Sequence, residues 1–190
     1  GNIGLQVLRA HRLGAQNIYA FEPIPNTFHI LSMNMKLNGM HNGFFNTALG
    51  EKNGVIGMNI TDFSAGMAQI QEDKEGLLQV PIETLNIFSD SHTELKTQKL
   101  SLIKIDVEGH EGEVINGALD FLKQHSDFNI IIEFGSPSSV SAVQTLDKNF
   151  TFSMKLYLWM QSPIDVDMSF VNDASKRESG DLVLFGLKKR

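Results

Sequence analysis

A short acidic segment in the middle of the chain carries the residue types best suited to chemistry. Four polar residues follow the apolar run Leu102–Ile105, namely Asp106, Glu108, His110 and Glu111. A buried strand that ends in acids and glycine is typical of the carboxyl edge of a parallel sheet, where α/β enzymes bind their ligands. Carboxylates placed there need a cationic partner, a shared proton or a substrate, because charges withdrawn from water are unstable alone.

The acids near this edge differ in the role that their positions predict. Asp106 ends the strand and Glu108 lies in the loop, so both are expected to point into a cleft. Glu111 and Glu113 fall in the first turn of the next helix, where the helix dipole favours negative charge. That explanation is sufficient for Glu113 and leaves the role of Glu111 open. Glu133 ends the next buried strand and is expected to face the same cleft.

His110 is a candidate general base, because an imidazole beside carboxylates can exchange a proton near neutral pH. The alternative is an exposed loop histidine. The other five histidines have no shared spacing, and no catalytic role is predicted for them. The acids Asp106, Glu108, Glu111 and Glu133 could also surround a hard divalent cation, but the metal-loop spacings are absent and no metal is predicted.

A second candidate site lies at the start of the chain. Gly1, Asn2 and Gly4 form a glycine-bearing turn before a helical pattern, and such a turn lets a ligand approach the backbone and its free N–H groups. Glu22 ends the next apolar run, where nucleotide-binding α/β folds use an acid to bind ribose hydroxyls. Together they favour a nucleoside-type ligand. A plain turn and a solvated or helix-capping acid are the alternatives.

The elements that must position these residues alternate between strands and helices, which predicts an α/β fold with a mostly parallel sheet. Helices are expected near residues 3–14, 25–39, 114–122 and 140–146. Buried strands are expected at residues 18–21, 43–49, 100–105 and 129–134. Alternating patterns predict antiparallel strands at residues 54–60 and 77–82, and two closing strands at 152–158 and 182–187.

Two polar, turn-rich segments are predicted to lack regular structure. Residues 62–67 form one loop, and residues 160–180 have no clear helical pattern between the closing strands. Structureless loops of this length in compact domains are usually functional. We expect these two segments to shape a substrate pocket.

Composition narrows the classes of protein to consider. The 190 residues predict a single domain over 1–190, and the net charge of −6 argues against a basic nucleic-acid-binding face. No apolar stretch approaches the roughly 20 residues that span a bilayer. The absence of cysteine excludes disulfides, zinc–thiolate sites and cysteine nucleophiles, and it suits a reducing, cytoplasmic compartment. Because the chain starts at Gly1 without methionine, we expect further N-terminal residues, among which a targeting segment is not excluded.

Short motifs occur in a fixed order over about residues 1 to 135. They are Phe21-Glu22-Pro23-Ile24-Pro25, Asn34, Leu37-Asn38-Gly39, Ala48-Leu49-Gly50, Ile103-Lys104-Ile105-Asp106-Val107-Glu108-Gly109-His110-Glu111, Gly117-Ala118 and Ile132-Glu133-Phe134. In order and spacing this set resembles the FkbM-type family of S-adenosylmethionine-dependent methyltransferases.

The resemblance implies a class I methyltransferase fold, a Rossmann-like, seven-stranded and mainly parallel sheet with an antiparallel final hairpin. It also implies S-adenosylmethionine as cofactor. Gly1, Asn2 and Gly4 would end the cofactor-binding glycine motif, Glu22 would bind the ribose hydroxyls, and Asp106 would lie near the methionine moiety. The family's glycine motif begins before Gly1, so the first, central strand is expected to be missing from this chain.

For the acceptor side, the resemblance implies methyl transfer to a hydroxyl oxygen of a sugar or another small-molecule or natural-product acceptor. Asp106, Glu108 and His110 are the candidate catalytic residues, although the His110 position varies in the family. Glu111 and Glu133 are candidate substrate-binding residues. Neither a nucleic-acid partner nor a transmembrane segment is expected, and the oligomeric state stays open.

Two other functions fit part of the pattern. The incomplete glycine motif favours a non-catalytic methyltransferase-like interaction module. The glycine turn and Glu22 also fit a nicotinamide-dependent oxidoreductase, but the segment from Asp106 to Glu111 does not.

Overall fold

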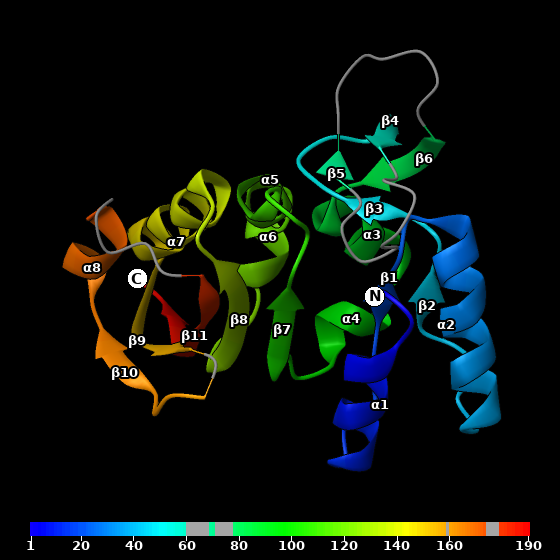
Figure 1. Cartoon of the computed structure of the whole chain (residues 1–190), viewed down its shortest axis with the longest axis horizontal. Helices are drawn as coiled ribbons and strands as arrows, with labels where there is room; N and C mark the ends of the chain where they lie inside the picture. Colours follow the sequence, from blue (N-terminus) through cyan, green and yellow to red (C-terminus); the bar gives the residue numbers. More distant parts are fainter. Residues whose placement is uncertain (60–68, 71–77, 159, 174–178) are drawn as a thin grey trace. The chain divides into compact units, whose positions relative to one another are not determined.

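The computed structural model describes residues 1–59, 69–70, 78–158, 160–173 and 179–190. Contacts divide the chain into two compact units (Figure 1). The first unit comprises Gly1–Leu49 and Asn53–Glu83, and the second comprises Gly50–Lys52 and Thr84–Arg190.

The first unit begins with two helices and two short strands. These are α1 (Leu5–Arg12), β1 (Ala20–Phe21), α2 (Pro25–Leu37) and β2 (Phe44–Phe45), and β1 and β2 are parallel. Proline at the first position of α2 suits the start of a helix, since its missing N–H would be unpaired there in any case. A small core of Val7, Ala20, Leu31 and Met35 joins the helices to β1. Both predicted helices are confirmed: α1 is two residues shorter than expected at each end, and α2 begins at the expected residue and ends two residues early.

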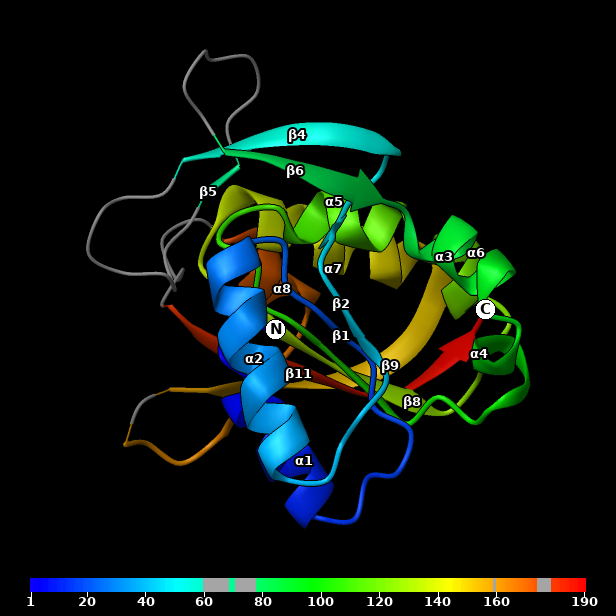
Figure 2. The same cartoon turned by 90° about the vertical axis from the view of Figure 1, so that its right-hand side faces the viewer.

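A second sheet of the first unit contains β3 (Ala48–Leu49), β4 (Gly54–Asn59), β5 (Gln69–Ile70) and β6 (Leu78–Glu83). The strand order is β3-β6-β4-β5. Strands β4 and β6 run antiparallel side by side (Figure 2), as their alternating patterns predict. The predicted loop at 62–67 lies outside the described residues.

The second unit contains a five-stranded sheet in the order β10-β9-β11-β8-β7. Its strands are β7 (Leu102–Ile105), β8 (Phe128–Phe134), β9 (Phe150–Tyr157), β10 (Ile164–Val166) and β11 (Gly180–Lys189). Strands β7 and β8 are parallel, whereas β11 pairs antiparallel with both β8 and β9. The antiparallel pairing of the closing strands is therefore confirmed. The described strands fall into three sheets, so a single seven-stranded sheet is not seen.

Six helices are described in the second unit. They are α3 (Leu85–Ser91), α4 (Glu94–Thr97), α5 (Glu111–Asn116), α6 (Leu119–Leu122), α7 (Pro137–Asn149) and α8 (Met168–Asn172). Ser136 caps α7, since its side chain accepts the Ser139 N–H and the Ser139 side chain accepts the Ser136 N–H in return. None of the described helices has both the length and the apolar character needed to cross a membrane.

The expectation that residues 160–180 lack regular structure is wrong for part of this segment. Residues 164–166 form β10 along β9, and residues 168–172 form α8. A local feature of the sequence, Asp167, marks the start of α8. Its side chain accepts the N–H groups of Ser169 and Phe170, as a helix N-cap residue does.

The single helical face expected over 114–122 is divided between α5 and α6 at Gly117. The Gly117 carbonyl accepts the Asn86 N–H, and its Cα packs against the Gly50 carbonyl. A Cβ at position 117 would lie 1.9 Å from the Gly50 oxygen, so glycine is required by this close approach.

Gly117→Ala is therefore expected to destabilise the protein by about 1–3 kcal/mol, because backbone rather than a flexible side chain must move. Urea unfolding measures the loss. Asn116→Ala, at the exposed neighbouring position, is the control and should stay within about 0.5 kcal/mol of the native protein. Equal stability of the two variants would contradict this role of Gly117.

Candidate active site

The strand register brings Asp106 and Glu133 to the same sheet edge. Ile105 of β7 pairs with Ile132 of β8 in a parallel ladder, so the next residue on each strand, an acid in both cases, lies at the carboxyl end. Ile105 and Ile132 are buried, and side chains alternate along a strand, which turns the two acids to the other face. The sequence prediction that Glu133 faces the same place as Asp106 is thus confirmed in position.

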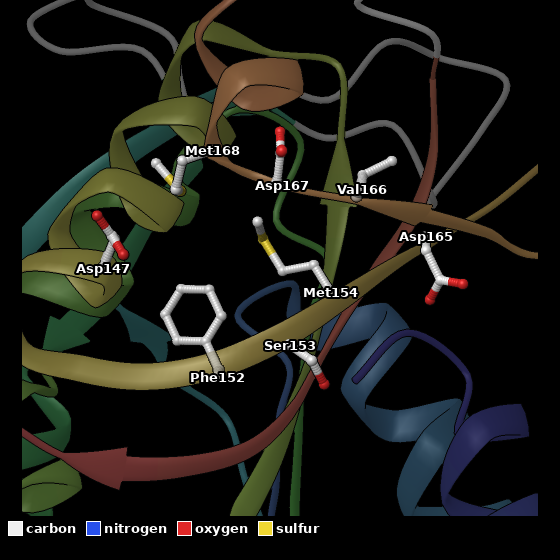
Figure 3. A pocket seen from close by; sticks show the side chains of 8 residues that line it. All are labelled: Asp147, Phe152, Ser153, Met154, Asp165, Val166, Asp167 and Met168. Atoms are coloured by element: carbon white, nitrogen blue, oxygen red, sulfur yellow. The ribbon is translucent and has the colours of Figure 1, made fainter.

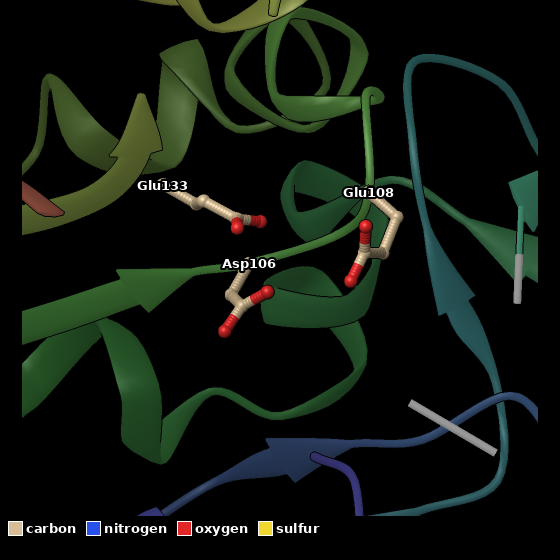
Figure 4. Close-up of side chains that lie close together, drawn as sticks. All are labelled: Asp106, Glu108 and Glu133. Carbon is tan, nitrogen blue, oxygen red and sulfur yellow. The ribbon is translucent and has the colours of Figure 1, made fainter. Parts of the chain in front are cut away.

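Glu108 joins this pair from the loop after β7. Its backbone is left-handed, with φ 52°, and Gly109 follows with φ 99°. One carboxylate oxygen each from Asp106, Glu108 and Glu133 lies within 4.8 Å of the other two. Figure 4 shows Glu108 and Glu133 pointing toward each other across the segment that carries Asp106. We call these three residues the acid cluster.

Lys104 partly neutralises the acid cluster. Its Nζ lies 2.6 Å from Oδ2 of Asp106, and both side chains are on one face of the chain because they are two residues apart. Burial raises the pKa of Asp106, but the hydrogen bond and charge of Lys104, together with a hydrogen bond from Glu133, hold that pKa below its usual value. Asp106 is therefore the ionised member of the pair that it forms with Glu133.

Glu133 is the member that holds a proton most firmly. Burial raises its pKa, the charges of Asp106 and Glu108 raise it further, and with a hydrogen bond to Asp106 and the charge of Glu111 it reaches about 7. The pKa of Glu108 is also raised, by burial and by the charges of Asp106 and Glu111. The cluster can therefore exchange a proton near neutral pH.

This pKa predicts how stability depends on pH. Glu133 ionises near 4.5 in the unfolded chain and near 7 in the folded protein, so the folded protein binds more protons between these values. The free energy of unfolding should therefore fall as pH rises from about 4.5 to about 7. Asp106, with its lowered pKa, has the opposite effect on the free energy of unfolding. Its contribution is lost only as the pH falls below about the usual value of 3.8.

Glu133→Gln should remove the fall in stability between pH 4.5 and 7. Thermal melts of both proteins at pH 5 and pH 8 measure this effect. The difference in melting temperature, variant minus native, should be more positive at pH 8 than at pH 5. If the melting temperatures of the variant and the native protein changed equally between pH 5 and pH 8, the raised pKa of Glu133 would be contradicted.

Glu111 lies beside the acid cluster but is only 1% exposed. Its Oε1 accepts the Gly109 N–H at 3.0 Å, and its Oε2 accepts the Ser136 hydroxyl at 2.9 Å. His110 is the N-cap residue of α5 and is half-buried, and within the described part of the chain its enclosed Nδ1 has no hydrogen-bond partner. Of the carboxylates expected beside His110, Glu111 is thus engaged with Gly109 and Ser136, and Asp106 is paired with Lys104.

Sequence reasoning missed Lys104 and Ser136 as members of this region. Lys104 was detectable, because a lysine two residues before a strand-end acid shares its face. Ser136 was harder to find, because it lies 25 residues from Glu111 and only the packing of α7 beside α5 brings them together (Figure 1).

The second candidate site, in the first unit, is built around Glu22 after β1. Glu22 is 7% exposed. Its Oε2 accepts the Asn2 N–H at 2.6 Å, and its Oε1 accepts the Ile24 N–H at 3.0 Å. The Gly1 nitrogen lies 3.8 Å from Oε2. The structure thus brings together Glu22 and the glycine-bearing turn that the sequence singled out.

Glycine is favoured at both ends of the turn, by a close approach to backbone at Gly1 and by the backbone conformation at Gly4. A Cβ at Gly1 would lie 2.8 Å from the Phe21 oxygen and 2.9 Å from the Cβ of Glu22. Gly4 has φ 91°, and a Cβ there would meet the Met35 side chain at 2.5 Å. At Gly1 the backbone of the turn therefore lies directly against the end of β1 and Glu22.

An open hollow of about 320 Å³ lies on β9, β10 and the adjacent helices (Figure 3). It is lined by Asp147, Phe152, Ser153, Met154, Asp165, Val166, Asp167 and Met168. Its acids are already engaged: Asp147 pairs with Arg190 at 3.0 Å, Asp165 pairs with Lys155 at 3.6 Å, and Asp167 caps α8. None of the acid cluster lines it, and we assign it no ligand.

Comparison with known proteins places these features in a family. The family model described as the methyltransferase FkbM domain matches residues 2–154. A protein of Beauveria bassiana (strain ARSEF 2860) called "Methyltransferase 1" is 27% identical over an alignment of 196 positions, which spans 88% of this chain and 76% of that protein. No solved structure matches significantly. Because the family model covers most of the chain, the chain belongs to the FkbM methyltransferase family.

Proposed function

We propose that this chain is an S-adenosylmethionine-dependent methyltransferase that methylates a hydroxyl oxygen of a small-molecule acceptor, such as a sugar or natural product. Membership of the FkbM family supports methyl transfer in general. The observation that carries the finer proposal is the acid cluster, in which an ionised Asp106 lies beside a Glu133 whose pKa is about 7. A hydroxyl acceptor needs such a group, since its proton must leave as the oxygen attacks.

The proposed cofactor site lies in the first unit and consists of Gly1, Asn2, Gly4 and Glu22. Its residues fit the group. Each oxygen of Glu22 accepts one backbone N–H, and a carboxylate oxygen has two lone pairs, so Glu22 can still accept from two ribose hydroxyls. When bound, S-adenosylmethionine supplies a sulfonium methyl group for displacement by a nucleophile.

At the acceptor side, we assign proton transfer to Glu133 together with Asp106 and Glu108. The acceptor hydroxyl would donate to an Oε atom of Glu133, which takes the proton as the oxygen–methyl bond forms. Asp106, held by Lys104, keeps a fixed negative charge beside Glu133 and so strengthens its affinity for the proton. Glu108 adds a second charge with the same effect.

His110 remains the third candidate catalytic residue, and its enclosed Nδ1 has less access to a methyl acceptor than the exposed carboxylate of Asp106 has. Both oxygens of Glu111 are already engaged, so we assign it a different role from substrate binding in the next subsection.

We also propose that the second unit is the later part of a class I methyltransferase sheet. The parallel pair β7–β8 and the antiparallel β11 between β8 and β9 support this proposal. They correspond to the part of the fold in which a parallel sheet closes with an antiparallel hairpin.

Methyl transfer from S-adenosylmethionine to a panel of hydroxyl acceptors tests this function. The full-length protein is incubated with donor labelled in the methyl group, and label is followed into sugars, lipids, polyketides and peptides. Transfer to at least one hydroxyl, with release of S-adenosylhomocysteine, is expected. Cofactor binding without transfer to any acceptor would instead identify a non-catalytic interaction module.

A further inference from the structure

Glu111 is the most deeply buried carboxylate of the second unit among the residues described, with 1% of its surface exposed. A carboxylate withdrawn from water is stable only if hydrogen bonds replace its hydration. Glu111 has two such bonds, from the Gly109 N–H to Oε1 and from the Ser136 hydroxyl to Oε2. Neither hydrogen bond involves a methyl acceptor, so the burial of Glu111 needs an explanation other than substrate binding.

The bond to Gly109 holds the loop that carries Glu108. Glu108 and Gly109 are both left-handed, with φ 52° and 99°, and glutamate rarely adopts this conformation unless its surroundings impose it. By accepting the N–H of Gly109, Glu111 closes the loop just before α5. The orientation of Glu108 therefore depends on Glu111.

The bond to Ser136 holds the segment that follows Glu133. Ser136 lies three residues after Glu133 and caps α7, where its oxygen accepts the Ser139 N–H at 2.9 Å. The same hydroxyl donates to Glu111. One buried carboxylate thus connects the loop after β7 to the segment after β8.

We infer that Glu111 is a positioning residue that holds Glu108 and Glu133 in their mutual arrangement and keeps a buried negative charge beside them. This inference rests on the proposed role of the acid cluster. The charge of Glu111 raises the pKa of both Glu108 and Glu133. Glu111 therefore acts on the proton of Glu133 without touching the acceptor.

Other charged and titratable groups near Glu133 come from each neighbouring element. They are Lys104 and Asp106 at β7, Glu108 and His110 in the loop, Glu111 on α5 and Asp181 opposite Glu133 on β11. Within this set, Glu111 combines burial with bonds to both segments that carry the reactive acids.

The chain contains a matched control for Glu111. Glu113, on the same helix, accepts the Ser138 hydroxyl at 2.9 Å, and Ser138 accepts the Gly112 N–H. This pair also joins α5 to α7 but does not touch the Glu108 loop. A merely structural role would give Glu111 and Glu113 the same behaviour.

The test compares Glu111→Gln with Glu113→Gln in the full-length protein. Glutamine keeps the size of the side chain and removes its charge. Carboxyl carbon NMR, with the Glu133 signal assigned through Glu133→Gln, follows the titration of Glu133 directly. Glu111→Gln should move the Glu133 midpoint to lower pH by about half a pH unit. Glu113→Gln should leave the midpoint unchanged.

An unchanged midpoint in Glu111→Gln, or an equal movement in Glu113→Gln, would overturn the inference. This NMR readout does not require methyl transfer, so it is independent of the proposed function.

If circular dichroism shows that Glu111→Gln does not fold, Ser136→Ala and Ser138→Ala replace the two glutamine variants. Ser136→Ala should then lower kcat about tenfold at unchanged KM for the donor, beyond any effect of Ser138→Ala. Equal kcat values for Ser136→Ala and Ser138→Ala would overturn the positioning role of Glu111.

Discussion

Glu133→Gln is expected to lower the rate of methyl transfer about a hundredfold, within the range that positioned proton transfer usually contributes. Glutamine has nearly the same shape but cannot take the acceptor's proton. The native rate should rise with pH through about 7, because Glu133 must lose its own proton before it can accept another. The variant should lack this rise. Initial rates measured between pH 5 and pH 9 test both expectations.

Asp181→Asn is the control for this substitution. Asp181 lies opposite Glu133 on β11 but is exposed, and its charge is screened by solvent. The methyl-transfer rate of Asp181→Asn should stay within about twofold of the native rate. A Glu133→Gln variant with native rate and native pH dependence would remove Glu133 from the chemistry.

Glu22→Ala is expected to weaken binding of S-adenosylmethionine by at least about tenfold, because hydrogen bonds to a charged group contribute roughly 1.5–3 kcal/mol. The substitution also leaves the N–H groups of Asn2 and Ile24 without their acceptor, so some loss of stability is expected. Isothermal titration calorimetry measures the affinity, and circular dichroism confirms that the variant is folded.

Glu83→Gln is the control for Glu22, since Glu83 ends β6 in the same unit and has no predicted contact with a ligand. Native affinity in Glu83→Gln together with a loss in Glu22→Ala would support the ribose assignment. A folded Glu22→Ala protein that binds as tightly as the native protein would disprove that assignment, while leaving methyl transfer itself untouched.

The parts of the fold that local pattern determines could be predicted from the sequence. The apolar runs before Asp106 and Glu133 gave two parallel strand ends, and the alternation at residues 54–60 and 77–82 gave an antiparallel pair. The break between α5 and α6 could not be predicted in this way. It depends on contact of Gly117 with Gly50, 67 positions earlier in the sequence (117 minus 50).

The position of the candidate site was predictable, but its protonation was not. The rule that parallel strands end at one edge predicts from the sequence that Glu133 lies with Asp106. Which acid holds the proton depends on Lys104, on burial and on Glu111, and these act through space. The enclosed carboxylate of Glu111 likewise depends on Ser136, whose position follows from the packing of two helices.

Binding of S-adenosylmethionine to the full-length protein is the most direct test of the central claim, because it requires no knowledge of the acceptor. Isothermal titration calorimetry should show saturable binding with about one site per chain and a Kd in the micromolar range, roughly 1–100 μM. The absence of any saturable binding by a folded protein at cofactor concentrations up to about 1 mM would contradict the proposed function.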